Sequence, residues 1–152
     1  MDDGLAGFRE MLNASMEAAQ RSPAEVIAAD EAERMTDEEF DTALWLSLCG
    51  CVDRGAEPSG WPEEVRAYYT TRMVDWEVAN GGFRQARAKF PEFFEPAAEG
   101  YELLGRPDLA VLLRSARAET DLESLDAFDV RLGQNDQERV AFARAHSSTF
   151  RL

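Results

Sequence analysis

Residues 62–91 read PEEVRAYYTTRMVDWEVANGGFRQARAKFP, and this stretch contains the signals that decide the fold. Pro62 is a favourable first residue of a helix. The apolar residues that follow recur at the spacing of one helix face: Val65, Tyr69, Met73 and Trp76. The pair Gly81-Gly82 predicts that this helix ends near Asn80, because glycine readily adopts the left-handed conformation of a helix C-cap. A second, short helix is expected over residues 83–90, before the closing proline.

Similar helix signals recur on both sides of this stretch. Three capping boxes, each a Ser or Thr followed three residues later by Glu, begin at Ser22, Thr36 and Thr120. The second box precedes one apolar face: Phe40, Leu44, Leu48 and Cys51. Further helices are expected over residues 4–20 and after Pro96, Pro107 and Asn135. The pattern predicts an all-α fold, an irregular multi-helix bundle of about eight or nine helices.

The length of 152 residues is that of one domain. We therefore expect a single helical domain over residues 1–152, with acidic N-terminal helices in residues 1–61 and a second helical region in residues 62–152. The two regions differ in charge. Residues 1–64 hold sixteen acidic and four basic side chains, whereas residues 65–152 hold fourteen and twelve. The acidity belongs mainly to the N-terminal part.

The net charge of −14 excludes direct nucleic-acid binding as the default, because contacts to phosphates need a basic surface. It favours a basic partner, including a protein that itself binds DNA. The acidic side chains expected to form a partner-binding surface lie close together in the N-terminal part: Asp30, Glu31, Glu33, Asp37, Glu38, Glu39 and Asp41. Solvated helix faces also carry such runs of acids, so this function is a hypothesis.

The chain shows no constellation typical of catalysis. It has one histidine, His146, and two cysteines, Cys49 and Cys51, at a spacing that suits neither a zinc site nor a disulfide. No phosphate-binding or nucleophile motif occurs. We predict a protein that is not an enzyme and binds no cofactor or metal. No apolar run is long enough to span a membrane and the N-terminus is acidic, so a cytoplasmic location is expected.

Three polar side chains lie at the Gly81-Gly82 corner: Glu77, Asn80 and Gln85. Our preferred interpretation is structural. In it, these side chains bond the unsatisfied backbone groups of the two helix ends, and Phe83 anchors the second helix in the core. The alternative is a small recognition site for a small molecule or substrate.

The corner carries a resemblance to a known family. The residues Glu77, Val78, Asn80, Gly81, Gly82, Phe83 and Gln85, followed by Leu104-Gly105, Ala110, Leu112-Leu113 and Ala116, are similar to a motif of the bacterial DNA-mimic protein family. The resemblance covers roughly residues 62–152, including the ending from Ala141 to Arg151. It departs at residues 86–90, where the family tends to carry an aromatic pair and an Asn, and this chain has two bases.

The resemblance implies an all-α fold and no known enzymatic activity. For the family's neisserial namesake it implies a dimer whose acidic surface imitates DNA phosphates and occupies the DNA-binding face of a transcriptional regulator. We therefore expect an acidic protein–protein interaction protein, a DNA mimic in its specific form, and a homodimer. Besides the recognition site at the corner, one further alternative is an accessory or immunity-type binder that uses an aromatic patch, for example Trp45, Trp61 and Tyr68.

Overall fold

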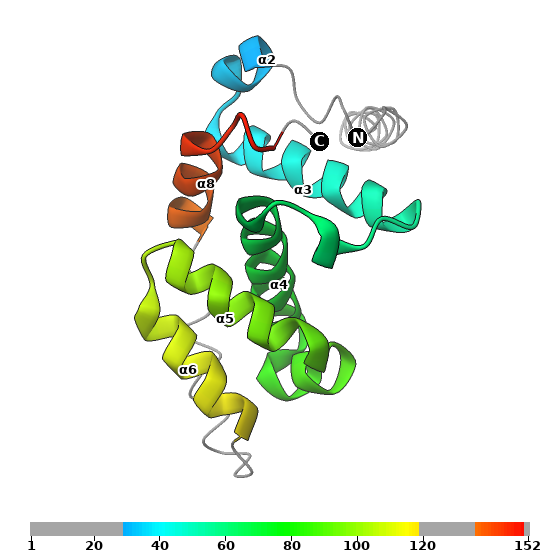
Figure 1. Ribbon diagram of the computed structural model, residues 1–152, viewed down its shortest axis with the longest axis vertical. Coiled ribbons are helices and arrows are strands. Elements are labelled where there is room, and N and C mark those ends of the chain that lie inside the picture. Colours follow the sequence, from blue (N-terminus) through cyan, green and yellow to red (C-terminus); the bar gives the residue numbers. More distant parts are fainter. Residues whose placement is uncertain (1–28, 119–135, 151–152) are drawn as a thin grey trace, which may run out of the picture. The chain divides into compact units, whose positions relative to one another are not determined.

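The computed structural model describes residues 29–118 and 136–150, which Figure 1 shows as ribbon. Every regular element in these ranges is helical, which confirms the all-α prediction. The α-helices are α2 (Ala29–Arg34), α3 (Asp37–Asp53), α4 (Glu63–Lys89), α5 (Phe94–Leu103), α6 (Pro107–Ala118) and α8 (Asp136–Ala145). Two short 3-10 helices are η2 (Pro58–Gly60) and η3 (Pro91–Phe93).

The described residues therefore hold six α-helices, fewer than the eight or nine expected. One reason is that the two helices expected over residues 62–80 and 83–90 form the single helix α4. The others are that the helices expected over residues 4–20 and after Thr120 lie outside the described residues, as do the capping box at Ser22 and the cap at Asn135. No described helix is both long and apolar enough to cross a membrane.

The chain divides into two compact units. The first comprises residues 1–58 and 147–152, and the second comprises residues 59–146. Within the first unit, α3 has the predicted start and the predicted apolar face. Thr36 is its N-cap, and the buried side chains include Phe40, Leu44, Leu48 and Cys51. The helix ends at Asp53, and Gly55, two residues later, has a positive φ of 92° that allows the backbone to turn back and bond the last carbonyl groups.

The kink in α4 lies at the predicted corner. Gly82 has φ 76° and ψ 166°, a conformation that is essentially restricted to glycine. Backbone hydrogen bonding resumes beyond it, so the helix continues to Lys89 in a new direction. The sequence correctly predicted a break at the two glycines, because Gly82 is non-helical and α4 consists of two helical segments that meet at this kink.

The core face of α4 differs from the predicted one. Val65 and Tyr69 are buried, but Trp76 is 49% exposed. The residues that pack into the core of the second unit are Val74 and Val78, on the opposite side of the helix from Trp76. The predicted apolar face is confirmed at Val65 and Tyr69 and wrong at Trp76. Farther along the helix the polar residues Thr71 and Asp75 occupy buried positions, which apolar periodicity does not reveal.

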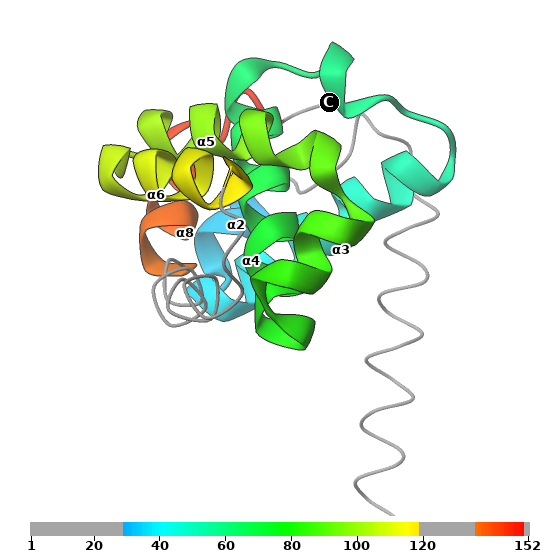
Figure 2. The ribbon, with the colours of Figure 1, turned by 90° about the horizontal axis from the view of Figure 1, so that it is seen from below.

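Helices α4, α5 and α6 form the body of the second unit, with α5 packed against both of the others (Figures 1 and 2). Their core contains Phe83, Phe94, Tyr101, Leu109 and Leu113, and the rings of Phe83 and Phe94 meet edge to face at 5.1 Å. Gly100 lets α5 approach α4 closely, because a Cβ there would lie 3.0 Å from the Ala67 Cα and carbonyl oxygen. Helix α8 packs on α4.

Candidate interaction surface

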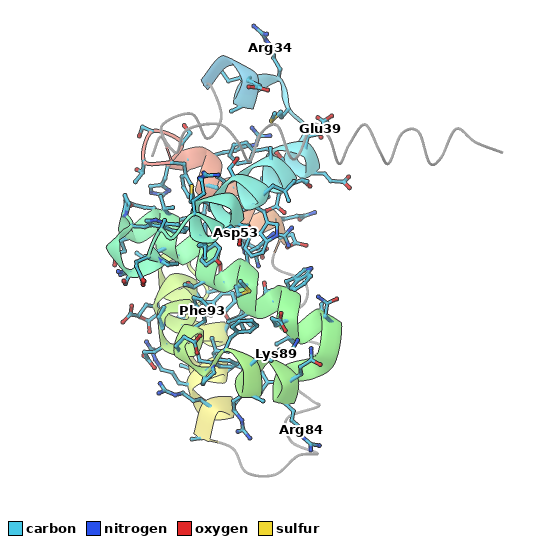
Figure 3. All side chains as sticks on the ribbon, turned by 90° about the vertical axis from the view of Figure 1, so that its right-hand side faces the viewer. Arg34, Glu39, Asp53, Arg84, Lys89 and Phe93 are labelled. Atoms are coloured by element: carbon cyan, nitrogen blue, oxygen red, sulfur yellow. The ribbon has the colours of Figure 1, made fainter. Side chains whose placement is uncertain are left out.

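The acidic side chains predicted to bind a partner lie on α2 and the first turns of α3. Glu31, Glu33, Asp37, Glu38 and Glu39 are exposed, and Asp30 belongs to α2. Figure 3 shows the labelled side chain of Arg34, on the same short helix, pointing away from the ribbon. Within the described part of the chain, no ion pair neutralises Glu31, Glu33 or Glu38.

Glu39 has a local structural role. Its carboxylate accepts hydrogen bonds from the Thr36 backbone N–H and hydroxyl, both at 2.8 Å, while the Thr36 hydroxyl oxygen accepts from the Glu39 N–H at 3.3 Å. This is the predicted capping box. The bond from the Thr36 backbone lowers the pKa of Glu39, and the bond from its hydroxyl acts in the same direction. Glu39 is therefore charged and held in place at the helix start.

Asp41 does not belong to an exposed surface, and its inclusion among the surface acids is wrong. Asp41 is only 8% exposed. The reason is its register, because Asp41 lies three and seven residues before the buried Leu44 and Leu48 and so shares their side of the helix. This spacing can be read from the sequence, but the neighbouring acids led us to assign Asp41 to the exposed acidic surface.

Most acids of α5, α6 and α8 are used differently, because arginines pair with them. Arg114 contacts Glu95 at 2.9 Å and Glu102 at 2.5 Å, and Arg117 contacts Glu95 at 3.4 Å. Arg106 pairs with Asp108 at 3.0 Å and with Glu138 on α8 at 3.3 Å. In the second unit these carboxylates tie neighbouring helices together, and each has a cationic partner.

The polar residues of the corner do not gather into one site. The Glu77 side chain is buried and lies 3.5 Å from the Lys89 ammonium, which links the two arms of the kinked helix. The Gln85 side chain folds over Gly81 and fills the space that a Cβ there would need. Asn80 is exposed, and Phe83 is buried in the core. Glu77 and Phe83 thus have structural roles at the corner, in an ion pair and in the core, whereas the predicted bonding of helix-end backbone groups by Glu77, Asn80 and Gln85 stays a prediction.

A buried polar network joins α4, α5 and α8, and the sequence patterns did not predict it. The fully buried Arg139 guanidinium donates to Asp75, to the Thr71 hydroxyl at 3.2 Å and to Asp136 at 2.7 Å. The second oxygen of Asp75 accepts from the Tyr101 hydroxyl. A single carboxylate on α4 thus holds both neighbouring helices. One feature of the sequence could have indicated this network. Thr71 and Asp75 lie four residues apart, each three residues before an apolar residue, Val74 or Val78.

Burial and charge act together on this network. Burial raises the pKa of Tyr101 well above its ordinary value, and the negative charge of Asp75 raises it further. Burial opposes the charged form of Arg139, but the interactions with Asp75, Tyr101 and Asp136 together outweigh it, so the pKa of the guanidinium is raised. Tyr101 is therefore a hydrogen-bond donor and Arg139 a cation, and both are committed to holding the fold.

Comparison with known families identifies the second unit. Residues 59–147 match the model of the DMP19-like proteins, where DMP19 denotes DNA mimic protein 19. The chain belongs to this family. The comparison with curated proteins gave no match, and neither did the comparison with solved structures.

The family match coincides almost residue for residue with the second compact unit, residues 59–146. It includes the kink at Gly82, the buried network and the arginine-paired acids. It excludes α2 and α3, where the exposed acidic residues of the predicted surface lie. In this member of the DMP19-like family, the residues that match the family model and the exposed acids of the predicted surface thus belong to different parts of the chain.

The aromatic patch suggested as an alternative binding surface is not formed as predicted. Tyr68 is buried, and Trp61 packs edge-on against Tyr69 at 5.2 Å. Trp45 is partly buried. The large apolar side chains exposed in the described residues are instead Trp76, Leu103 and Val111.

The residues that catalysis or metal binding would require have local contacts. The His146 ring lies against Phe142, with ring centres 4.4 Å apart and Nδ1 2.9 Å from the Phe142 carbonyl oxygen. Cys49 and Cys51 are free cysteines, and Cys51 is buried. Among the described residues, no group of three or more His, Cys, Asp or Glu is arranged to hold a metal ion.

Proposed function

We propose that this DMP19-like protein is a DNA mimic that occupies the DNA-binding face of a basic protein, such as a transcriptional regulator. Family membership supports a DNA-mimic protein without catalytic activity. The observation that carries the proposal for this chain is the group Glu31, Glu33 and Glu38. These carboxylates are exposed and unpaired within the described residues, so their charge is available to a partner.

The electrostatic argument favours α2 and the start of α3 over the family region. Residues 29–41 hold seven acidic side chains and one basic one. Residues 59–146 hold sixteen acidic and eleven basic ones, and arginines pair with several of those acids. Exposed carboxylates such as Glu31, Glu33 and Glu38 steer a basic partner from a distance, and the attraction falls steeply with ionic strength.

The experiment uses the immobilised chain and a lysate of the source organism. Captured proteins are eluted with short duplex DNA, because a DNA mimic and DNA compete for one face. The chain should then inhibit DNA binding by the eluted protein, and the inhibition should weaken with salt. If duplex DNA releases no protein, or if the released protein binds DNA equally well in the presence of the chain, the proposal is wrong.

A matched pair of variants locates the surface. The triple substitution Glu31→Gln, Glu33→Gln and Glu38→Gln removes three exposed charges from α2 and α3. The control, Glu63→Gln, Glu92→Gln and Glu99→Gln, removes three exposed charges from residues 59–146. We expect inhibition to fall by about tenfold or more for the first variant, equivalent to about 1.4 kcal/mol, and to change little for the second. Equal losses would contradict the location.

No observation favours the corner as a catalytic or small-molecule site. Its carboxylate, Glu77, is buried against Lys89, and Gln85 covers Gly81. The homodimer expected from the family resemblance remains part of the proposal.

A further inference from the structure

The outward side of α4 carries charge opposite to that of the chain as a whole. Residues 65–90 hold five basic and two acidic side chains. The two acids, Asp75 and Glu77, are both buried. The five bases are all at least partly exposed: Arg66, Arg72, Arg84, Arg87 and Lys89. The first turn of α4 carries Glu63 and Glu64, and Lys89 pairs with Glu77. Beyond that first turn, α4 therefore has an excess of basic side chains at its surface, on a chain whose net charge is −14.

An exposed tryptophan lies on this positive side. Trp76 is 49% exposed, and Arg72 and Asn80 lie one helical turn before and after it on the same side of α4. Beyond the kink, Figure 3 shows the Arg84 side chain pointing away from the ribbon. We call Arg72, Trp76, Asn80 and Arg84 the cationic face. Tryptophan and arginine are the residues most enriched among those that dominate protein–protein binding energy.

We propose that the cationic face binds the acidic segment, residues 29–41, of a second copy of this chain. Charge complementarity supports this occupant, because the segment has a net charge of −6 and exposes Glu31, Glu33 and Glu38. Each copy carries one cationic face and one acidic segment. The contact therefore joins two different surfaces head to tail, unlike an interface in which the same surface meets itself.

The head-to-tail contact competes with the proposed function. An acidic segment held by a second copy cannot occupy the DNA-binding face of a partner, so self-association lowers the concentration of active mimic. This consequence rests on the proposed function. The self-association itself does not, and it is measured on the chain alone. Because exposed charges dominate the contact, it dissociates at about 1 M salt, where the Debye length is about 3 Å.

The test combines two variants of the full chain in sedimentation equilibrium at low salt. The first, Trp76→Ala with Arg84→Glu, loses the cationic face and keeps the acidic segment. The second, Glu31→Gln, Glu33→Gln and Glu38→Gln, loses the acidic charges and keeps the cationic face. We expect the average mass of the unaltered chain to rise with concentration above the mass that it keeps at about 1 M salt, so that the comparison does not depend on whether the 17.0 kDa chain also forms the homodimer of the proposed function. Any rise in either variant alone should be smaller, and their mixture should form a further one-to-one complex.

The mixing result decides the inference. A mixture that associates no more than its two components would overturn it, and so would full self-association of either variant alone. A separate control, Leu103→Ala, removes an exposed apolar side chain outside the cationic face and should leave self-association unchanged. Circular dichroism checks that all variants keep their helices, since each altered side chain is exposed. Loss of partner binding with normal self-association would contradict the proposed function alone.

Discussion

The acids of residues 29–41 and those of the family region are the same chemical groups in different settings. On α5, α6 and α8, Glu95, Glu102, Asp108 and Glu138 each lie beside an arginine, so their charges hold helices together. On α2 and the start of α3, Glu31, Glu33 and Glu38 have no ion pair among the described residues. Acidic composition alone therefore does not locate a binding surface. We place the proposed surface where the acids have no cationic partner among the described residues.

The buried network should show the largest effect on stability. Arg139→Met leaves the Asp75 carboxylate buried without its cation, which we expect to cost about 3–5 kcal/mol of unfolding free energy. The double variant Asp75→Leu with Arg139→Met removes both charges and should be less destabilised than Arg139→Met alone. Urea unfolding followed by circular dichroism measures both. A cost of less than about 1 kcal/mol for Arg139→Met would show that the network contributes little.

The second-largest effect on stability is expected at the close contact between α5 and α4. Gly100→Ala places a Cβ 3.0 Å from the Ala67 backbone, which cannot move aside as a flexible side chain can. We expect a loss of about 1–3 kcal/mol. Gly60→Ala is the control, because nothing lies within 4 Å of its Cβ position. If thermal unfolding shows equal changes for the two variants, the helices are less tightly packed than the structure indicates.

A smaller effect on stability is expected when an acid paired with arginines is neutralised than when the buried network is broken, and it can be compared with the effect of neutralising an acid outside those pairs. Glu95→Gln removes a charge paired with Arg114 and Arg117 and should cost about 0.2–1 kcal/mol, an effect that disappears at high salt. Glu38→Gln removes an unpaired charge and should leave stability nearly unchanged while weakening partner binding. Unfolding at low and high salt tests the first statement. A larger loss of stability for Glu38→Gln would reverse the comparison.

The smallest effect concerns the capping box. Hydrogen bonds from Thr36 lower the pKa of Glu39, so the folded state favours the carboxylate more than the unfolded state does. Its contribution to stability is present above the ordinary pKa and is lost as pH falls through the lowered value. Glu39→Gln should therefore flatten the acid end of the stability–pH profile slightly. The profile of Glu38→Gln, the neighbouring control, should follow that of the unaltered chain; if Glu39→Gln follows it too, the capping bond is not coupled to pH.

The sequence by itself determined the features that depend on near neighbours. These include the capping box at Thr36, the apolar face of α3, the break at Gly82 and the family motif. Each is decided by residues within about one helical turn, where backbone geometry follows from side-chain type. The excess of acids in the N-terminal part likewise follows from the amino-acid sequence alone.

Only the tertiary structure decided which polar groups are partnered. Asp75 and Arg139 are 64 residues apart in the chain, so their pairing depends on how α8 packs on α4. Tertiary packing also explains the exposure of Trp76. The network requires the side of α4 that carries Thr71 and Asp75 to face the core, so Trp76, on another side of the helix, faces solvent. Local patterns cannot distinguish a buried, paired carboxylate such as Asp75 from an exposed, unpaired one such as Glu38, because partners distant in sequence make the difference.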